Sequence, residues 1–185
     1  MSKIVTAPSS HTEESVVCAV LRAVVVMGVS GCGKSSLALA IAQDQGGNML
    51  EGDAFHPATS QEKMTKGIPL TDQDRTGWLQ SLGKALAQST ASTVVLSCSA
   101  LKKSYRDTLR SYKPNLRFVY LDISPATALA RVSSRAVADG HFFPATLVDN
   151  QFATLEVPTG EVGVLTVDAN APLPELVAQV RAWLG

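Results

Sequence analysis

A phosphate-binding pattern lies near the start of the chain, in the segment Gly28-Val29-Ser30-Gly31-Cys32-Gly33-Lys34-Ser35. Glycines at this spacing let the backbone wrap closely around a polyphosphate, and consecutive N–H groups and the positive end of the following helix dipole attract its charge. We expect Lys34 to reach the β- and γ-phosphates and the Ser35 hydroxyl to be a ligand of Mg²⁺. The residues expected to hold ATP and Mg²⁺ are therefore Gly28, Val29, Ser30, Gly31, Cys32, Gly33, Lys34, Ser35 and Ser36.

Two carboxylates follow a short apolar segment further along the chain, in Glu51-Gly52-Asp53. Residues two apart on an extended segment point to the same side, so both carboxylates would face the place where the loop presents a γ-phosphate. Phosphoryl transfer asks a protein mainly to position the reactants and to stabilise charge. We interpret one carboxylate as orienting the magnesium shell and Asp53 as accepting the proton of an attacking alcohol. The alternative interpretation is a solvated acidic turn.

Short apolar, β-rich segments alternate with helical patterns along the chain. The five predicted strands are Ala23 to Met27, Asn48 to Glu51, Thr93 to Cys98, Leu116 to Asp122 and Val162 to Val167. The predicted helices are Lys34 to Gln45, Asp74 to Gln88, Pro125 to about Arg135, Pro144 to about Leu155 and Pro174 to Leu184. This alternation predicts a parallel sheet with helices on both faces, which gathers ligands at the carboxyl ends of its strands.

The composition excludes several classes of protein. The chain has 185 residues, 45% of them hydrophobic, which is enough for one packed domain. Sixteen basic residues balance sixteen acidic ones, without the excess of a protein that coats nucleic acid or an anionic membrane. The spacing of Cys18, Cys32 and Cys98 suits neither a disulfide framework nor a zinc site. We therefore predict a cytoplasmic protein with one domain over residues 20–185, after an N-terminal extension over 1–19 to which the sequence assigns no role.

A series of further motifs accompanies the phosphate-binding pattern. They are Gly52-Asp53 with His56-Pro57, Lys63-Met64, the run from Gly67 to Arg75, Trp78-Leu79, the run from Cys98 to Lys103 with Tyr105-Arg106-Asp107, Gly140-His141-Phe142-Phe143, and Gln151-Phe152 with Thr154-Leu155-Glu156. With these motifs the chain from about Val24 to its end resembles the gluconate kinases, small P-loop sugar-acid kinases of the nucleoside-monophosphate-kinase type. The resemblance implies ATP-dependent phosphorylation of D-gluconate at its 6-hydroxyl to give 6-phosphogluconate. It also implies a three-layer P-loop kinase fold, with a five-stranded parallel sheet flanked by helices and a mobile lid, commonly in a homodimer.

A substrate with a carboxylate and several hydroxyls needs cationic donors and a polar cradle. The cations that follow the second and third predicted strands are Arg75, Lys102, Lys103 and Arg106. We predict that Lys102, Arg106 and Arg75 bind the sugar acid, with Lys103 as a further candidate, and that Ser99 and His56 add neutral hydrogen bonds.

The segment of about 131–145 is expected to form the lid over the triphosphate. There we predict that Arg131 stabilises the transferring phosphoryl group, that Arg135 also contacts the nucleotide, and that His141 contacts the substrate. The segment Ala136-Val137-Ala138-Asp139 lengthens the usual spacing between the second arginine and Gly-His-Phe in the family. The segment Asp168 to Pro172 is interpreted either as the adenine-edge loop or as a plain turn.

Two other functions remain open at the level of the sequence. A kinase for another small acceptor, such as shikimate or a nucleoside monophosphate, would share the phosphate-binding loop, although shikimate kinases usually carry a Gly-Gly-Gly loop where Gly67-Ile68-Pro69 stands here. A non-catalytic nucleotide-binding module is the second alternative, and Asp53 beside a complete magnesium-binding Ser35 argues against it.

Overall fold

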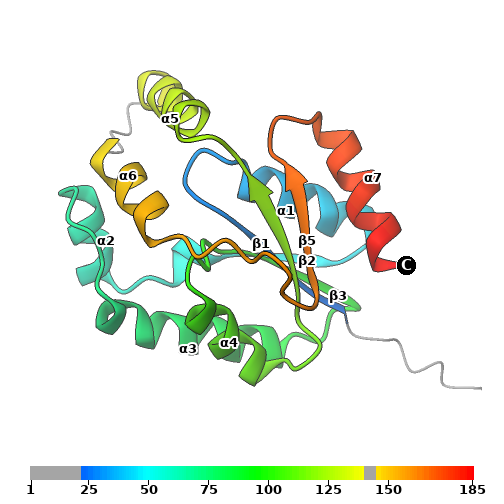
Figure 1. Ribbon diagram of the computed structural model, residues 1–185. Coiled ribbons are helices and arrows are strands. Elements are labelled where there is room, and N and C mark those ends of the chain that lie inside the picture. The colour runs from blue at the N-terminus through cyan, green and yellow to red at the C-terminus, as the bar shows by residue number, and fades with distance from the viewer. Residues whose placement is uncertain (1–21, 140–144) are drawn as a thin grey trace, which may run out of the picture.

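A five-stranded parallel sheet forms the centre of the molecule (Figure 1). The computed structural model describes residues 22–139 and 145–185. The strands are β1 (Arg22–Met27), β2 (Asn48–Glu51), β3 (Thr93–Ser97), β4 (Arg117–Asp122) and β5 (Val164–Asp168). Their order is β2-β3-β1-β4-β5, and every pair of neighbours is parallel. The predicted sheet is confirmed, and its order brings the carboxyl ends of β1, β2 and β3 together at one edge.

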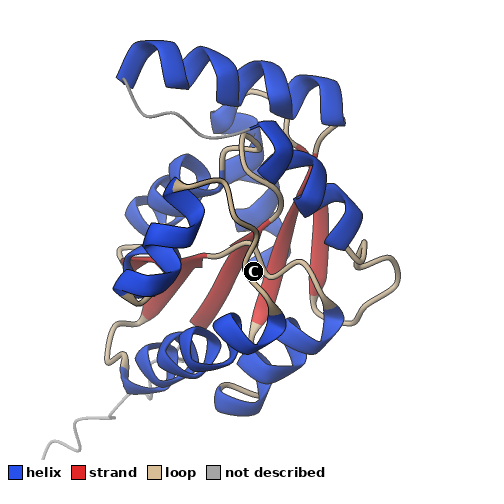
Figure 2. Ribbon diagram, turned by 90° about the vertical axis from the view of Figure 1, so that its left-hand side faces the viewer, coloured by secondary structure: helices blue, strands red, loops and turns tan. Residues whose placement is uncertain are grey.

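Helices cover both faces of this sheet and give a three-layer architecture (Figure 2). They are α1 (Lys34–Asp44), the 3₁₀ turn η1 (Gly52–Phe55), α2 (Ala58–Thr65), α3 (Asp72–Gln88), α4 (Lys103–Tyr112), α5 (Pro125–Asp139), α6 (Ala145–Thr154) and α7 (Leu173–Leu184). Residues of α1, α5, α6 and α7 share one core cluster with the sheet, and residues of α3 and α4 share the other.

The central strand β1 shows why the predicted strands are continuously apolar. Val24 and Val26 pack in the cluster with α1 and α7, whereas Val25 and Met27 pack in the cluster with α3 and α4. All four side chains are fully buried. A strand covered on both faces has no polar alternation, as expected for a parallel sheet.

Several element boundaries differ from the sequence prediction, each for a local reason. Helix α3 starts two residues early because Thr71 and Asp74 form a capping box. Strand β5 starts at Val164, since Val162 is 93% exposed and Gly163 turns the chain with φ of 75°. Helices α2 and α4 were not predicted, because both are rich in polar residues.

The predicted N-terminal extension and the predicted lid lie wholly or partly outside these elements. The extension over 1–19 and the lid residues 140–144, with His141 among them, lie outside the described residues. The described part of the lid forms the C-terminal half of α5 and the first residue of α6. Over the described ranges, no helix combines the length and apolar character needed to cross a bilayer.

Candidate functional site

The phosphate-binding loop connects β1 to α1 and lies against α5. Gly31 has φ of 85°, and a Cβ at this residue would lie 2.6 Å from the carbonyl oxygen of Ala128 in α5. Gly33 precedes α1 with φ of 97°, a left-handed conformation that other residues adopt at a cost. The two glycines therefore let the loop turn tightly beneath α5 and enter α1 at once.

The loop offers a set of free donors. The Ser30 amide donates to Gln151, and the Cys32 amide to the Val29 carbonyl. No acceptor in the described residues receives a hydrogen bond from the amides of Gly31, Gly33, Lys34 or Ser35. Unpaired amides at the start of a helix, next to its positive dipole end, form an anion-binding site.

The lysine and hydroxyl of the motif stay close to this loop. Lys34 Nζ donates to the Val29 carbonyl at 3.0 Å, and Ser35 Oγ lies 3.4 Å from Ser97 Oγ at the end of β3. No group of three or more His, Cys, Asp or Glu side chains able to hold a metal occurs in the part of the chain described. A hydroxyl beside a phosphate cradle instead fits Mg²⁺, which is usually held through few protein oxygens together with substrate phosphates and water.

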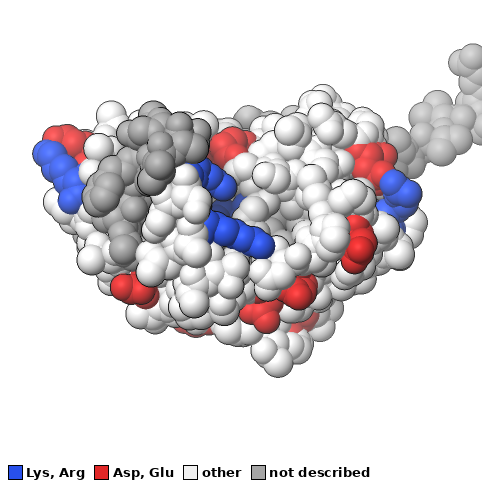
Figure 3. Space-filling model, turned by 90° about the horizontal axis from the view of Figure 1, so that it is seen from above, with Lys and Arg blue, Asp and Glu red and all other residues white. Residues whose placement is uncertain are grey.

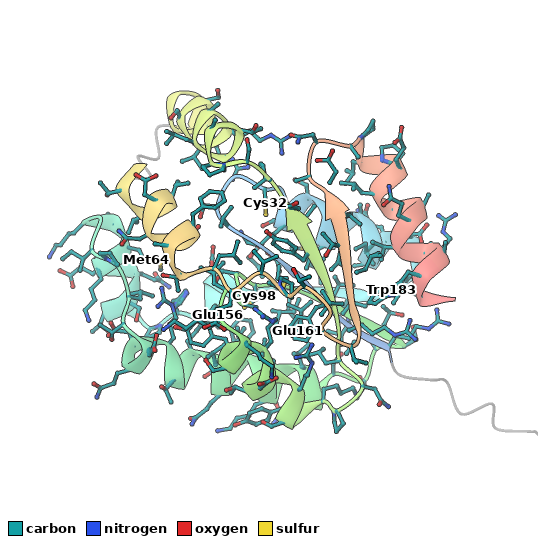
Figure 4. The ribbon with its side chains drawn as sticks, in the orientation of Figure 1. Cys32, Met64, Cys98, Glu156, Glu161 and Trp183 are labelled. Carbon is teal, nitrogen blue, oxygen red and sulfur yellow. The ribbon has the colours of Figure 1, made fainter. Side chains whose placement is uncertain are left out.

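Charged groups of three segments converge on the end of β3. The pKa of the Cys98 thiol is raised to about 12, mainly by burial and also by the Asp53 and Glu51 carboxylates, whereas a backbone hydrogen bond from Ala100 and the Lys34 ammonium lower it. Cys98 and Cys32 are both buried (Figure 4). The predicted carboxylates and the loop lysine thus lie near one another, as their positions after β1 and β2 require.

A cavity of about 120 Å³ adjoins the loop, and we call it the acceptor cavity. It is lined by Ser30, Lys34, Asp53, His56, Met64, Ile68, Pro69, Leu70, Arg75, Trp78, Ser99, Leu147, Asn150, Gln151 and Thr154. The view onto this edge of the sheet shows basic side chains gathered at a central hollow (Figure 3). The structure therefore brings six residues predicted from the sequence to one cavity, namely Ser30, Lys34, Asp53, His56, Arg75 and Ser99.

Asp53 is placed by the 3₁₀ turn that follows β2. A Cβ at Gly52 would lie 2.4 Å from the Ser97 carbonyl oxygen, so only glycine lets this turn approach the end of β3. Asp53 is exposed at the mouth of the cavity, and no described residue forms a side-chain hydrogen bond with it. Its carboxylate is accordingly available to an incoming hydroxyl.

His56 forms part of the cavity wall and is 7% exposed. Its ring stacks on Trp78 with centroids 4.2 Å apart, and Trp78 Nε1 donates to the Gly52 carbonyl at 2.8 Å. His56 Nδ1 is buried without a hydrogen-bond partner. Burial lowers the pKa of His56, against an opposing effect of the Asp53 charge, so the imidazole is neutral at pH 7. A neutral ring with an unsatisfied nitrogen suits a hydroxyl-bearing ligand.

Arg75 supplies positive charge at the other side of the cavity. Its Nη1 donates to the Leu70 carbonyl at 2.6 Å and lies 3.4 Å from Tyr105 Oη. Its Nη2 and Nε donate to no described residue. A guanidinium held on one nitrogen and free on the others can bind a carboxylate through two parallel hydrogen bonds.

Comparisons with known proteins agree with this geometry. Residues 24–158 match the AAA domain family. The thermoresistant gluconokinase of Escherichia coli (strain K12) is 44% identical over 157 residues, which are 83% of this chain and 88% of that protein. The gluconokinase of Gluconobacter oxydans (strain 621H) is 41% identical over 87% of this chain and 92% of its own. The chain belongs to the gluconokinase family.

A solved structure supports the same assignment. The crystal structure of a gluconokinase from Sinorhizobium meliloti 1021 superposes with a TM-score of 0.80 at 48% identity, covering 89% of this chain and 92% of that one. Membership of the gluconokinase family, a P-loop kinase fold and a nucleotide-binding loop are thus established for this chain.

Two cations that were predicted from the gluconokinase motifs lie apart from the cavity lining. Lys102 Nζ donates to both carboxylate oxygens of Asp72 at 2.8 Å, and Tyr105 Oη donates to the same carboxylate. The hydrogen bonds from Lys102 and Tyr105 lower the pKa of Asp72. Lys103 pairs with Asp107 on the surface of α4. Both ammonium groups have carboxylate partners on α3 or α4 and neither lines the cavity, so their binding of the acceptor stays a prediction.

Arg106 is also predicted to bind the acceptor, but its side chain is fully buried and does not line the cavity. Its Nε donates to Glu161 at 3.1 Å, its Nη1 donates to the carbonyls of Ala100 and Leu101 at 3.0 Å, and its Nη2 donates to Glu161 and to the Glu156 carbonyl. The Glu156 carboxylate in turn accepts a hydrogen bond from the Lys103 amide at the start of α4. Figure 4 labels Glu156 and Glu161 beside α4. We call Lys103, Arg106, Glu156 and Glu161 the α4 anchor, and it holds the chain that follows α6.

The predicted lid arginines, Arg131 and Arg135, lie in α5. Arg131 Nη1 donates to the Ala169 carbonyl at 3.0 Å and Nη2 donates to Asn170 Oδ1 at 3.2 Å. Arg131 therefore connects α5 to the segment after β5 that was interpreted either as the adenine-edge loop or as a plain turn. Arg135 is exposed one turn further along.

Sequence reasoning missed Gln151 as a site residue, although its motif was recognised. Gln151 lies in α6 and lines the cavity together with Leu147, Asn150 and Thr154. The Gln151 side chain carries no charge and belongs to no common metal-binding or nucleophile pattern. Only its place in the structure therefore indicates that it is a site residue.

Proposed function

We propose that this chain is a gluconokinase that transfers the γ-phosphate of ATP to the 6-hydroxyl of D-gluconate. The products would be 6-phospho-D-gluconate and ADP. The observation that carries the proposal is the acceptor cavity, in which a proton acceptor, a free guanidinium and a neutral histidine adjoin the phosphate-binding loop. This set suits a small acid with several hydroxyls.

The proposed transfer uses the loop on one side and Asp53 on the other. The free amides of Gly31, Gly33, Lys34 and Ser35 hold the phosphates. Lys34 swings from the Val29 carbonyl to the β- and γ-phosphates, and the Ser35 hydroxyl is available to Mg²⁺. Magnesium supplies charge neutralisation on the phosphates when it is bound. Asp53 accepts the hydroxyl proton as the oxygen bonds to the γ-phosphorus and the bond from that phosphorus to the β–γ bridging oxygen breaks.

The acceptor would lie with its two ends at different residues. Arg75 is proposed to bind the carboxylate, and His56 and Ser99 to hydrogen-bond hydroxyls between that end and Asp53. Arg131 is proposed to stabilise the transferring phosphoryl group when the lid residues close, with Arg135 near the nucleotide and His141 near the acceptor.

A coupled assay of ADP release tests the function directly. Purified protein is offered gluconate, shikimate, AMP, CMP or no acceptor, each with MgATP. We expect turnover with gluconate and a negligible rate without an acceptor. Turnover with shikimate or AMP but not with gluconate would refute the proposal.

We also propose the setting in which the enzyme works. The family resemblance supports a homodimer in the cytoplasm, with one kinase domain over residues 20–185 and a lid over about 131–145. Light scattering on a size-exclusion column tests the proposed homodimer, since a mass near 19.5 kDa would mean a monomer.

A further inference from the structure

The side chain of Gln151 contacts the phosphate-binding loop. Its Oε1 accepts a hydrogen bond from the Ser30 amide at 2.6 Å, across 121 positions of the sequence. The neighbouring loop amides of Gly31, Gly33, Lys34 and Ser35 stay open for phosphate. The Ser30 amide is thus withdrawn from the cradle and used to orient a side chain of α6.

This contact fixes which end of the Gln151 amide faces the cavity. A backbone N–H can only donate, so only the carbonyl oxygen of Gln151 can face Ser30. The NH₂ end must then point away from the loop, and no acceptor within the described residues receives a hydrogen bond from it. Because Gln151 lines the acceptor cavity, two unused donors stand at its wall beside the loop.

The rest of the α6 wall offers few such donors. Asn150 Nδ2 donates to the Thr146 carbonyl at 2.8 Å, and Thr154 Oγ1 donates to the Asn150 carbonyl at 2.7 Å. Leu147 is apolar and buried. Gln151 is therefore the α6 side chain best suited to hydrogen-bond an acceptor molecule.

The helix that carries Gln151 is held firmly at its C-terminal end. Phe152 and Leu155 pack against the hydrophobic core, and the Glu156 amide donates to the Leu101 carbonyl at 2.9 Å. The Glu156 carboxylate and carbonyl are both engaged in the α4 anchor. A donor on a helix fixed in this way keeps its position when a substrate binds.

We propose that Gln151 is a substrate-binding residue that donates a hydrogen bond to the acceptor, at a hydroxyl close to the transferred phosphoryl group. The Ser30 amide is its positioning partner, so the nucleotide loop sets the orientation of an acceptor contact. The inference rests on the proposed function, because the acceptor is taken to be gluconate.

Two substitutions separate this role from a purely structural one. Gln151→Glu keeps an oxygen that can accept from the Ser30 amide but replaces the two donors with a negative charge near phosphate. Gln151→Met keeps the length of the side chain and removes both the oxygen that accepts from Ser30 and the two donors. Asp149→Asn changes one charge on the exposed face of the same helix and serves as the matched control.

Steady-state kinetics with MgATP and gluconate, together with MgADP binding and thermal unfolding, provide the test. We expect Gln151→Glu to lower kcat/KM for gluconate about 100-fold and Gln151→Met about 10-fold, with MgADP binding changed less than about threefold. Asp149→Asn should match the wild type. Thermal unfolding shows whether each variant is folded.

Which of the two variants is more active decides whether Gln151 binds the acceptor or only ties α6 to the loop. If Gln151 only ties α6 to the loop, Gln151→Glu keeps the tie and should be more active than Gln151→Met, which would overturn the inference. Near-normal kinetics for both variants would also overturn it. Failure of the wild type and Asp149→Asn to phosphorylate gluconate would instead refute the proposed function.

Discussion

Arg75 and Arg106 carry the same charge on neighbouring helices but belong to regions with different tasks. Around Arg75, in the acceptor cavity, polar groups are left open: the Arg75 Nη2, the Asp53 carboxylate and His56 Nδ1 have no partners among the described residues. Around Arg106, in the α4 anchor, every guanidinium nitrogen donates to a carbonyl or to Glu161. Unsatisfied groups mark the region that binds a ligand, and satisfied groups mark the region that supports it.

This difference predicts that substitutions in the two regions change different quantities. Changes in the acceptor cavity should lower activity at nearly constant stability. Changes in the α4 anchor should lower stability at nearly constant activity of the folded enzyme. The predictions below run from the largest expected effect to the smallest.

Asp53→Asn is the strongest test of the cavity side. Loss of the proton acceptor should lower kcat by about 10² to 10⁴-fold, while MgADP binding and the unfolding temperature change little. Steady-state kinetics and isothermal titration measure the two quantities. A kcat close to that of the wild type would show that Asp53 has no part in proton transfer.

Arg106→Met is the corresponding test of the anchor. It leaves Glu161 with Arg110 alone and removes a donor from the carbonyls of Ala100, Leu101 and Glu156, so we expect the free energy of unfolding to fall by about 3 kcal/mol. Urea denaturation measures this loss. The free energy of unfolding of Arg106→Lys should lie between those of the wild type and Arg106→Met, because a lysine cannot form the same forked contacts. A variant of normal stability with a raised KM for gluconate would place Arg106 in substrate binding after all.

Arg75→Met should affect the acceptor and not the fold. Loss of a charge-assisted contact with a carboxylate should raise the KM for gluconate about 30-fold, with the KM for ATP nearly constant. Lys84→Met, on the exposed face of the same helix α3, is the control for the change in charge. An equal effect of both variants on KM would mean that Arg75 acts only through the overall electrostatic field.

The smallest of the expected effects is a difference between the wild type and Arg106→Met in how their free energies of unfolding depend on pH. The hydrogen bonds from Arg106 lower the pKa of Glu161, although burial opposes them. A carboxyl with a lowered pKa stabilises the folded state above its ordinary pKa of 4.5, and this contribution is lost as the pH falls through the lowered value. Urea denaturation between pH 7 and pH 3 should therefore show a steeper loss below about pH 4.5 in the wild type. Parallel curves would contradict this coupling.

The sequence predicted the nucleotide side better than the acceptor side, for a physical reason. The loop from Gly28 to Ser35 is contiguous, and its flanking strand and helix follow from local apolar patterns. The roles of Arg106 and Lys102 depend on Glu161, which is 55 positions away from Arg106, and on Asp72, which is 30 positions away from Lys102. Helix α4 was missed for the same reason, since its buried face includes an arginine that a periodicity analysis counts as exposed.

Gln151 illustrates a second limit of sequence reasoning. Its motif was part of the resemblance, but a neutral amide side chain does not indicate a particular function until its neighbours in the structure are known. Only the bond to the Ser30 amide shows which end of the side chain is free. Conversely, Asp53 was singled out because two carboxylates, one at the end of a short predicted strand and one in the turn that follows it, suggest chemistry by themselves.

The close approach of Gly52 to the end of β3 means that a residue without any functional group determines where the Asp53 carboxylate lies. A single added methyl would push the turn off the sheet and carry that carboxylate with it, although the carboxylate itself would still be present. The placement of the proposed proton acceptor is thus a matter of clearance between two stretches of main chain as much as of the residue types around them.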